Sequence, residues 1–144
     1  AFSAPGRESR RQEADTMQIH QSAEDYLETI LMLSQRMGKV RSIDVVNELG
    51  FTKASVSIAM KKLRENGYIA VDGEGNLTLL EPGLEIAQRI YSRHQLLTHF
   101  FVQLGVDEEV AAEDACKAEH ILSEQTLEKI REYALLHDAQ DSVK

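Results

Sequence analysis

Three side chains that can bind a metal ion lie close together in the last third of the sequence: Cys116, Glu119 and His120. Residues three and four positions apart are neighbours on a helix, so the thiol, the carboxylate and the imidazole would share one helical face. Such a mixed set of sulfur, oxygen and nitrogen donors suits a divalent transition metal. The alternative is a thiol packed in the core beside a solvated Glu-His pair, because free cysteine is commonly buried. Taken alone, the segment favours that alternative.

Other candidate ligands are spread over the rest of the chain. Asp25 and Glu28 lie one helical turn apart near the start of the first apolar helix, and His94 lies among apolar neighbours in a long helix. Each again has a simpler interpretation. The two acids are favoured by the helix dipole if they lie in a first turn, and the imidazole can be a partly buried histidine with one satisfied nitrogen.

A catalytic use of the same residues is the rival interpretation. Cys116 and His120 have the residue types of a nucleophile and its base. Side chains on adjacent helical turns, however, rarely aim a thiolate at an open substrate cleft. The sequence also contains no glycine-rich phosphate-binding loop and neither of the hydrolase motifs HExxH and GxSxG. It therefore does not predict an enzyme.

The elements that would position these residues are mainly helical. Two short helices joined by a tight glycine-containing turn, with a β-hairpin around DGEGN after them, are typical of a winged helix-turn-helix. A longer helix, opened by Pro82 and Gly83, and two shorter helices follow. Apolar spacing and capping residues predict helices over residues 22–37, 42–49, 52–66, 83–104, 110–122 and 123–135, and strands over residues 68–71 and 77–80.

The charge distribution indicates where a nucleic acid would bind. A net charge of −8 argues at first against a polyanionic partner. However, residues 53–64 contain four basic residues and no acid, whereas residues 107–144 contain eleven acidic and four basic residues. Only the local basic stretch has to face the polyanion, although a basic helix taken alone is more often simply solvated. Together with the short helix before it and the hairpin after it, the second short helix is predicted to bind double-stranded DNA. The residues expected to contact DNA are Arg41, Thr52, Lys53, Ala54, Ser55, Ser57, Lys61 and Lys62.

Size and composition indicate one or two compact domains in a reducing compartment. With 42% hydrophobic residues and no apolar run near the ~18–20 residues that span a bilayer, no membrane partner is expected. A single cysteine suits the cytoplasm. We expect residues 1–16 to be a flexible tail or a remnant of the expression vector, with the native start at Met17. Residues 17–83 would form the DNA-binding domain, and residues 84–144 a helical domain.

Four segments, in this order and with these spacings, resemble the DtxR/MntR family of metal-dependent repressors, which are related to the diphtheria toxin repressor. They are SAEDYLETI in the first helix, NLTLLEPG at the exit of the hairpin, SRHQLLTHFFVQLGVDEE in the long helix, and DACKAEHILS. The resemblance covers about residues 20–136. It implies a homodimer in a short two-domain form, with an N-terminal winged helix that binds operator DNA. The C-terminal helical domain would bind metal and hold the protomers together.

The same resemblance implies which residues bind the metal. Five positions match the manganese-sensing branch, whereas Cys116 matches the iron-sensing branch and replaces a glutamate of the manganese branch. Thiolate is the softer ligand, which favours Fe²⁺ over Mn²⁺. We therefore expect Fe²⁺, with Mn²⁺ second and Co²⁺ or Zn²⁺ as surrogates. The implied ligands are Asp25, Glu28, His94, Cys116, Glu119 and His120.

Two further interpretations stay open at this point. The chain can be a metal-independent winged-helix regulator whose C-terminal helices only form a dimer. It can also be an interaction module that uses the winged helix as a scaffold and binds no DNA. Within the resemblance itself, an Mn²⁺-responsive repressor is the alternative to an Fe²⁺-responsive one.

Overall fold

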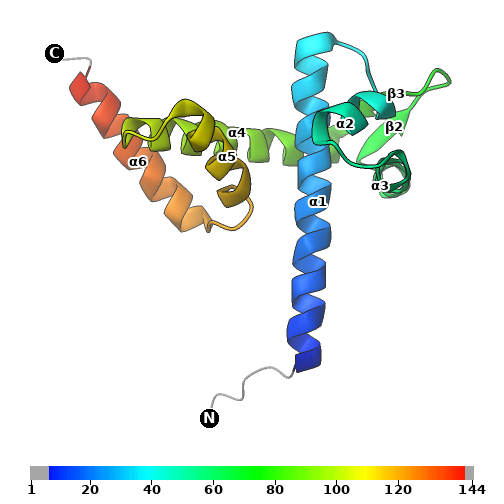
Figure 1. Ribbon diagram of the computed structural model, residues 1–144, viewed down its shortest axis with the longest axis horizontal. Helices are drawn as coiled ribbons and strands as arrows, with labels where there is room; N and C mark the ends of the chain where they lie inside the picture. The colour runs from blue at the N-terminus through cyan, green and yellow to red at the C-terminus, as the bar shows by residue number, and fades with distance from the viewer. Residues whose placement is uncertain (1–6, 142–144) are drawn as a thin grey trace. The chain divides into compact units, whose positions relative to one another are not determined.

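A computed structural model describes the backbone of residues 7–141 and the side chains of residues 21–140. Within this range the chain divides into two compact units, one ending at Ala87 and the other beginning at Gln88. Both this division and the expected domain boundary at residue 83 fall in the first turns of α4. The elements are α1 (Arg7–Met37), β1 (Val40–Arg41), α2 (Ser42–Leu49), α3 (Lys53–Glu65), β2 (Ile69–Val71), β3 (Asn76–Leu79), α4 (Glu81–Gln103), α5 (Glu108–Ala118) and α6 (Glu124–Asp141) (Figure 1).

The helix pair α2–α3 forms where the sequence predicted it, because local signals set its bounds. Gly50 adopts a left-handed conformation, with φ of 71°, and ends α2. The hydroxyl of Thr52 then accepts a hydrogen bond from the Ser55 amide, at 3.1 Å, and begins α3. One detail differs, since Arg41 rather than Ser42 stands at the N-cap of α2, where its amide donates to the Asp44 carboxylate at 2.9 Å.

The hairpin that follows α3 is the wing. Strands β2 and β3 pair antiparallel, with Ala70 opposite Thr78, and their connecting loop projects from the unit (Figure 1). β1 pairs with the other edge of β3 to give the order β1-β3-β2. The sequence did not predict β1, because two residues are too few to show an alternating pattern.

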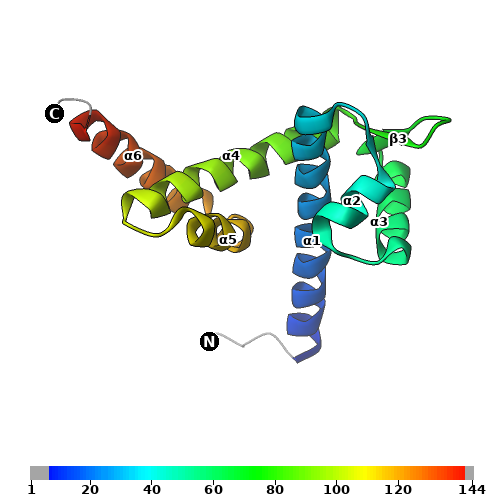
Figure 2. The ribbon, with the colours of Figure 1, turned by 45° about the horizontal axis from the view of Figure 1, so that its top comes forward.

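The first unit is held together by an apolar core between α1, α2, α3 and the sheet. Figure 2 shows α2 lying between α1 and α3, which it contacts on either side. Tyr26 and Phe51 add an edge-to-face ring contact, with centroids 6.0 Å apart. The large core side chains are less than 2% exposed: Leu27, Ile30, Val40, Val45, Val56 and Ile69.

The second unit is built from α5, α6 and the part of α4 that follows Ala87. Its fully buried centre takes one side chain from each helix, namely Leu97, Ala115 and Leu127. Partly buried apolar residues surround that centre: Leu96, Phe101, Ala118, Leu122 and Ile130. The first unit is thus the winged helix-turn-helix, and the second the helical domain, that the sequence predicted. No helix in the described part of the chain is long and apolar enough to cross a membrane.

Two helix bounds differ from the prediction. α1 begins at Arg7, so residues 7–16, expected to be a flexible tail, are helical, while residues 1–6 lie outside the described range. The stretch from residue 7 to residue 16 is rich in Arg and Glu and lacks Gly and Pro, so nothing in it interrupts a helix. α5 ends at Ala118, four residues earlier than predicted.

Candidate metal centre and nucleic-acid interface

A buried carboxylate lies between two imidazoles in the second unit. The side chain of Glu119 is 0% exposed. One of its oxygens, Oε2, lies 3.0 Å from Nδ1 of His94, and the other, Oε1, lies 3.4 Å from Nε2 of His120. The two histidine side chains are 20% and 2% exposed. The structure therefore brings together three of the six predicted metal ligands within this unit.

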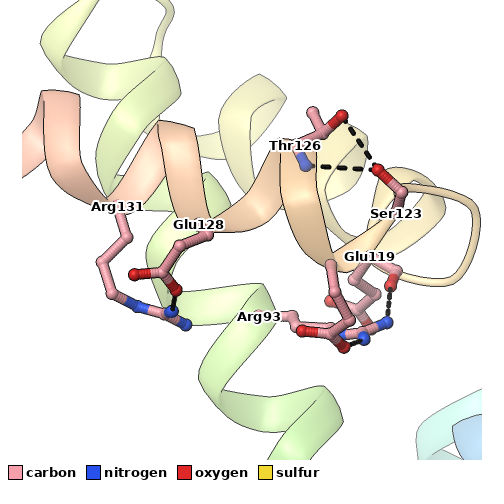
Figure 3. Close-up of polar contacts among 7 residues, drawn as sticks. Arg93, Glu119, Ser123, Thr126, Glu128 and Arg131 are labelled. Atoms are coloured by element: carbon pink, nitrogen blue, oxygen red, sulfur yellow. Dashed lines mark hydrogen bonds and ion pairs between the residues drawn. The ribbon is translucent and has the colours of Figure 1, made fainter.

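Glu119 and His120 are positioned by the end of α5, which comes earlier than the sequence predicted. Glu119 is the C-cap residue of α5, and His120 lies in the turn beyond it rather than on the helical face that the sequence predicted. Arg93 of α4 donates to the main-chain carbonyl of Glu119 at 3.2 Å and forms an ion pair with Glu124 (Figure 3). With that carbonyl satisfied by a side chain, α5 can end without a glycine.

Arg93 is the residue of the site that the sequence did not predict. Its side chain is only 14% exposed and links α4 to the turn that carries Glu119. The available signal was its place next to His94, but a single arginine beside a histidine is too common to interpret. Ser123 completes the turn, because its hydroxyl accepts from the amide of Thr126 at 3.2 Å and begins α6.

The structure contradicts the interpretation of Cys116 as a core residue. Its side chain is exposed, on the last turns of α5 and three residues before Glu119. The residues that fill the core from the same helix are Ala111 and Ala115. A thiol on the exposed side of α5 contributes little to packing, so its chemistry is the more relevant property.

The two remaining predicted ligands belong to the first unit. Asp25 and Glu28 lie in the interior of α1, which begins at Arg7. The simpler interpretation, first-turn acids favoured by the helix dipole, is therefore wrong, since that effect fades within about one turn. Glu28 is only 6% exposed. Burial raises the pKa of the neighbouring Tyr26 phenol, and the charge of Asp25 raises it further.

These donors have the chemistry that a divalent cation requires. Taking a carboxylate out of water is costly unless it is paired or coordinates a metal. His94 and His120 each present one ring nitrogen to a different oxygen of the buried Glu119 carboxylate, so nitrogen and oxygen donors lie close together. Imidazole and carboxylate together suit Mn²⁺, Fe²⁺ and the later divalent ions. The residues present therefore fit a metal ion.

The predicted DNA contacts on α3 form its solvent-exposed face. Val56, Met60 and Leu63 are buried, as the spacing predicted. The opposite side begins with Lys53, continues with mostly small residues and ends with basic residues, with no acidic residue before Glu65. The exposed predicted contacts in and beside α3 are Thr52, Lys53, Ala54, Ser55, Ser57, Lys61 and Lys62.

The remaining predicted contact, Arg41, lies in β1, the strand that pairs with the wing. Its side chain is exposed and lies against the hairpin turn, where a Cβ added at Gly75 would be 3.4 Å from Nη2 of the guanidinium. The turn itself is built around Asp72, whose carboxylate accepts from Asn76 and from the Glu74 amide. The hydrogen bonds from the Asn76 side chain and main chain lower the pKa of Asp72 below its ordinary value.

The fold and the two sites together define a winged-helix DNA-binding protein with a helical metal-binding domain. Residues 18–77 match the iron dependent repressor, N-terminal DNA binding domain, and residues 80–136 match the iron dependent repressor, metal binding and dimerisation domain. The chain belongs to this family of metal-dependent transcriptional repressors, the DtxR/MntR family that the sequence motifs resembled. Its members regulate transcription and are not enzymes.

Individual relatives agree with this assignment. An uncharacterised HTH-type transcriptional regulator of Methanocaldococcus jannaschii is 36% identical over 115 residues, which are 78% of this chain and 92% of that one. The HTH-type transcriptional regulator MntR of Bacillus subtilis is 32% identical over 123 residues, 85% of this chain and 87% of that one.

Solved structures give the same result for the fold. A manganese-dependent transcriptional repressor in complex with manganese has a TM-score of 0.71 and 27% identity, over 78% of this chain and 52% of that one. The manganese regulator SloR has a TM-score of 0.68 and 26% identity, over 77% of this chain and 52% of that one. The chain thus spans about half the length of these solved structures.

Proposed function

We propose that the chain is a repressor that binds operator DNA as a homodimer when it is loaded with Fe²⁺. The observation that carries the proposal is the fully buried Glu119 between His94 and His120. A carboxylate so placed is a poor structural element but a good ligand, because a divalent cation offsets the cost of its burial. The descriptions of the two matched domains, as DNA-binding and as metal-binding and dimerisation, support DNA binding and dimer formation.

The proposed site takes ligands from both units of the chain. Asp25 and Glu28 contribute oxygen donors from α1, and the other four ligands come from α4, α5 and the turn after α5. A bound divalent cation supplies the positive charge that several carboxylates need in order to converge. The full proposed set is Asp25, Glu28, His94, Cys116, Glu119 and His120.

The switch follows from the charges of these side chains. Three carboxylates, those of Asp25, Glu28 and Glu119, repel one another when they approach without a cation. The arrangement that brings them together is then poorly populated until metal binds it more tightly than the alternatives. If the same arrangement sets the spacing of two α3 helices in a dimer, metal binding raises affinity for DNA.

In the proposed complex α3 enters the major groove. The small side chains of Ala54, Ser55 and Ser57 allow a close approach to base edges, whereas Lys53 and Lys61 neutralise phosphates. Thr52 and Lys62 flank them, and Arg41 would contact the DNA backbone from β1, beside the wing. Because each neutralised phosphate releases counterions, affinity should fall steeply with salt concentration.

Cys116 is the reason to propose Fe²⁺ rather than Mn²⁺. Thiolate is a softer ligand than carboxylate and moves preference toward Fe²⁺ and later metals. Mn²⁺ is the second candidate, and it is favoured by the relatives named MntR and by the manganese-dependent repressor of similar structure. Co²⁺ and Zn²⁺ should act as surrogates in vitro.

Anaerobic titration with Fe²⁺ and Mn²⁺ tests both levels of the proposal. Affinity for each metal is measured by calorimetry, and DNA affinity by binding to duplexes selected from a random library. We expect either metal to raise DNA affinity, and Cys116→Glu to reduce the ratio of Fe²⁺ to Mn²⁺ affinity by about tenfold, or ~1.4 kcal/mol. An unchanged ratio would show that Cys116 does not favour Fe²⁺, and the reason to prefer Fe²⁺ over Mn²⁺ would be lost.

A different outcome would support the metal-independent alternative. In that case neither metal would change DNA affinity, and His120→Ala and Glu119→Gln would bind metal as weakly as the wild-type chain. Sequence-selective DNA binding without metal would then leave a winged-helix dimer as the function. Absence of salt-dependent DNA binding would leave only an interaction module.

A further inference from the structure

The outer face of α3 carries a large aliphatic side chain whose exposure the fold does not require. Ile58 is 58% exposed and lies on the side of the helix opposite Val56, Met60 and Leu63, which fill the core. It is the one large apolar residue on the exposed face of α3 within the described side chains. Single exposed aliphatic residues are common on protein surfaces, so its surroundings decide its meaning.

The neighbours of Ile58 are small on one side and basic on the other. By helical spacing it lies over Ala54 and Ser55, one turn before it, and beside Lys61 and Lys62, one turn after it. Helical side chains lean toward the N-terminus, so the isoleucine leans over the two smallest neighbours. It therefore protrudes furthest where the backbone of α3 can approach a partner most closely.

This combination fits the major groove of DNA better than a protein surface. A protein interface needs a cluster of apolar residues of several hundred square ångströms, which a single isoleucine among lysines does not provide. In the major groove the phosphates lie on either side of the base edges, and the apolar group exposed there is the C5 methyl of thymine. Lysines that flank an aliphatic residue match this arrangement.

We infer that Ile58 is a specificity-determining residue that contacts the C5 methyl of one thymine in each operator half-site. The inference rests on the proposed function, in which α3 enters the major groove. The contact would give the protein a preference for a T·A pair at one position of the half-site, because Ile58 loses this contact at G·C and C·G pairs. The small neighbours Ala54 and Ser55 leave room for the methyl beside the isoleucine.

Uracil substitution isolates this contact, because deoxyuridine lacks only the methyl group and keeps every hydrogen-bonding edge of thymine. High-affinity duplexes are first selected from a random library with the full chain in saturating Mn²⁺. Each thymine of the selected half-site is then replaced in turn. We expect one position at which the replacement weakens wild-type binding about fourfold, which corresponds to one buried methyl.

The variant Ile58→Ala should bind the thymine and the deoxyuridine duplexes equally, which closes a double-mutant cycle on the contact. Ile43→Ala is the matched control, because it removes another exposed isoleucine, 43% exposed, from α2 of the same unit. The control should keep the fourfold discrimination. Both α3 and α2 variants are at exposed positions, so neither should change the free energy of unfolding by more than about 0.5 kcal/mol.

The outcomes separate this inference from the function on which it rests. If no deoxyuridine position weakens wild-type binding, or if the weakening persists in Ile58→Ala, Ile58 does not read a methyl group, although the chain still binds operator DNA. If the wild-type chain enriches no sequence at all, the proposed DNA-binding function fails, and the inference fails with it.

Discussion

The contact between Arg93 and the turn after α5 gives the sharpest prediction about the metal-binding unit. The guanidinium donates to the carbonyl of Glu119 at 3.2 Å and pairs with Glu124 (Figure 3). We expect Arg93→Met to loosen this turn. Methionine has a similar length and helix propensity but no donor. The Glu119 carbonyl is then left without its side-chain donor, while most of the packing of a side chain that is 14% exposed is kept.

The magnitude is worked from two of the interactions that Arg93 makes. A hydrogen bond from a charged donor contributes ~1.5–3 kcal/mol. The ion pair adds less, ~0.2–1 kcal/mol, because Glu124 is 77% exposed and is screened by solvent. The expected loss in free energy of unfolding is therefore about 2–4 kcal/mol. Arg131→Met is the matched control, since its pair with Glu128 at 2.6 Å joins two side chains that are 46% and 58% exposed. It should cost less than about 1 kcal/mol.

Two measurements check this prediction. Urea unfolding followed by circular dichroism gives the free energies of the wild-type chain and both variants. Calorimetric titration with Mn²⁺ gives the second value, because loss of a group that orients a ligand typically lowers metal affinity about 10- to 100-fold. If Arg93→Met and Arg131→Met have equal effects on both quantities, Arg93 does not position Glu119.

Two further predictions concern the first unit. Gly83→Ala should cost about 1–3 kcal/mol in urea unfolding, because a Cβ there overlaps the carbonyl oxygen of Tyr68 and lies 3.0 Å from its carbonyl carbon. Gly73→Ala, with nothing within 4 Å, is the control and should be nearly neutral. The lowered pKa of Asp72 should stabilise the wing above pH ~3.9, and this contribution is lost as pH falls through the folded-state pKa. NMR titration of the carboxyl group checks the second prediction, and a pKa at or above the ordinary value contradicts it.

The parts of the fold that were predicted correctly depend on short-range signals. Thr52 and Gly50 specify the turn between α2 and α3 through hydrogen bonds and backbone conformations within a few residues. The hairpin turn around Asp72 is equally local. Because each signal and its effect lie within about five residues, no knowledge of the tertiary structure was needed to interpret them.

Two of the errors, both in α5, lie where a distant residue decides the outcome. The end of α5 at Ala118 coincides with a hydrogen bond from Arg93, which is 26 residues away from Glu119 along the chain. The exposure of Cys116 depends on which face of α5 packs against α4 and α6, and the alanines of that helix make a weak apolar stripe. Neither fact can be derived from periodicity alone.

The site itself shows the same division. Residue types and spacing raised all six candidate ligands, but each had a simpler interpretation until the resemblance joined them. The structure then removed two of those interpretations, because Asp25 and Glu28 are far from the start of α1 and Cys116 is not in the core. The choice between Fe²⁺ and Mn²⁺ stays a prediction, since ligand softness is the argument for it.

The position of Glu119 suggests why α4 carries Arg93 and His94 side by side. Arg93 holds the main-chain carbonyl of Glu119, and His94 holds its side-chain carboxylate at 3.0 Å. Two consecutive residues of one helix thus fix both the backbone and the rotamer of the same residue. If Glu119 is a metal ligand, as proposed above, a side chain fixed in this way loses less conformational entropy when a cation binds, which raises affinity without any additional donor. Burial of the carboxylate is costly, and this rigid support is what the proposed function needs in order to keep Glu119 in place until a metal ion offsets that cost.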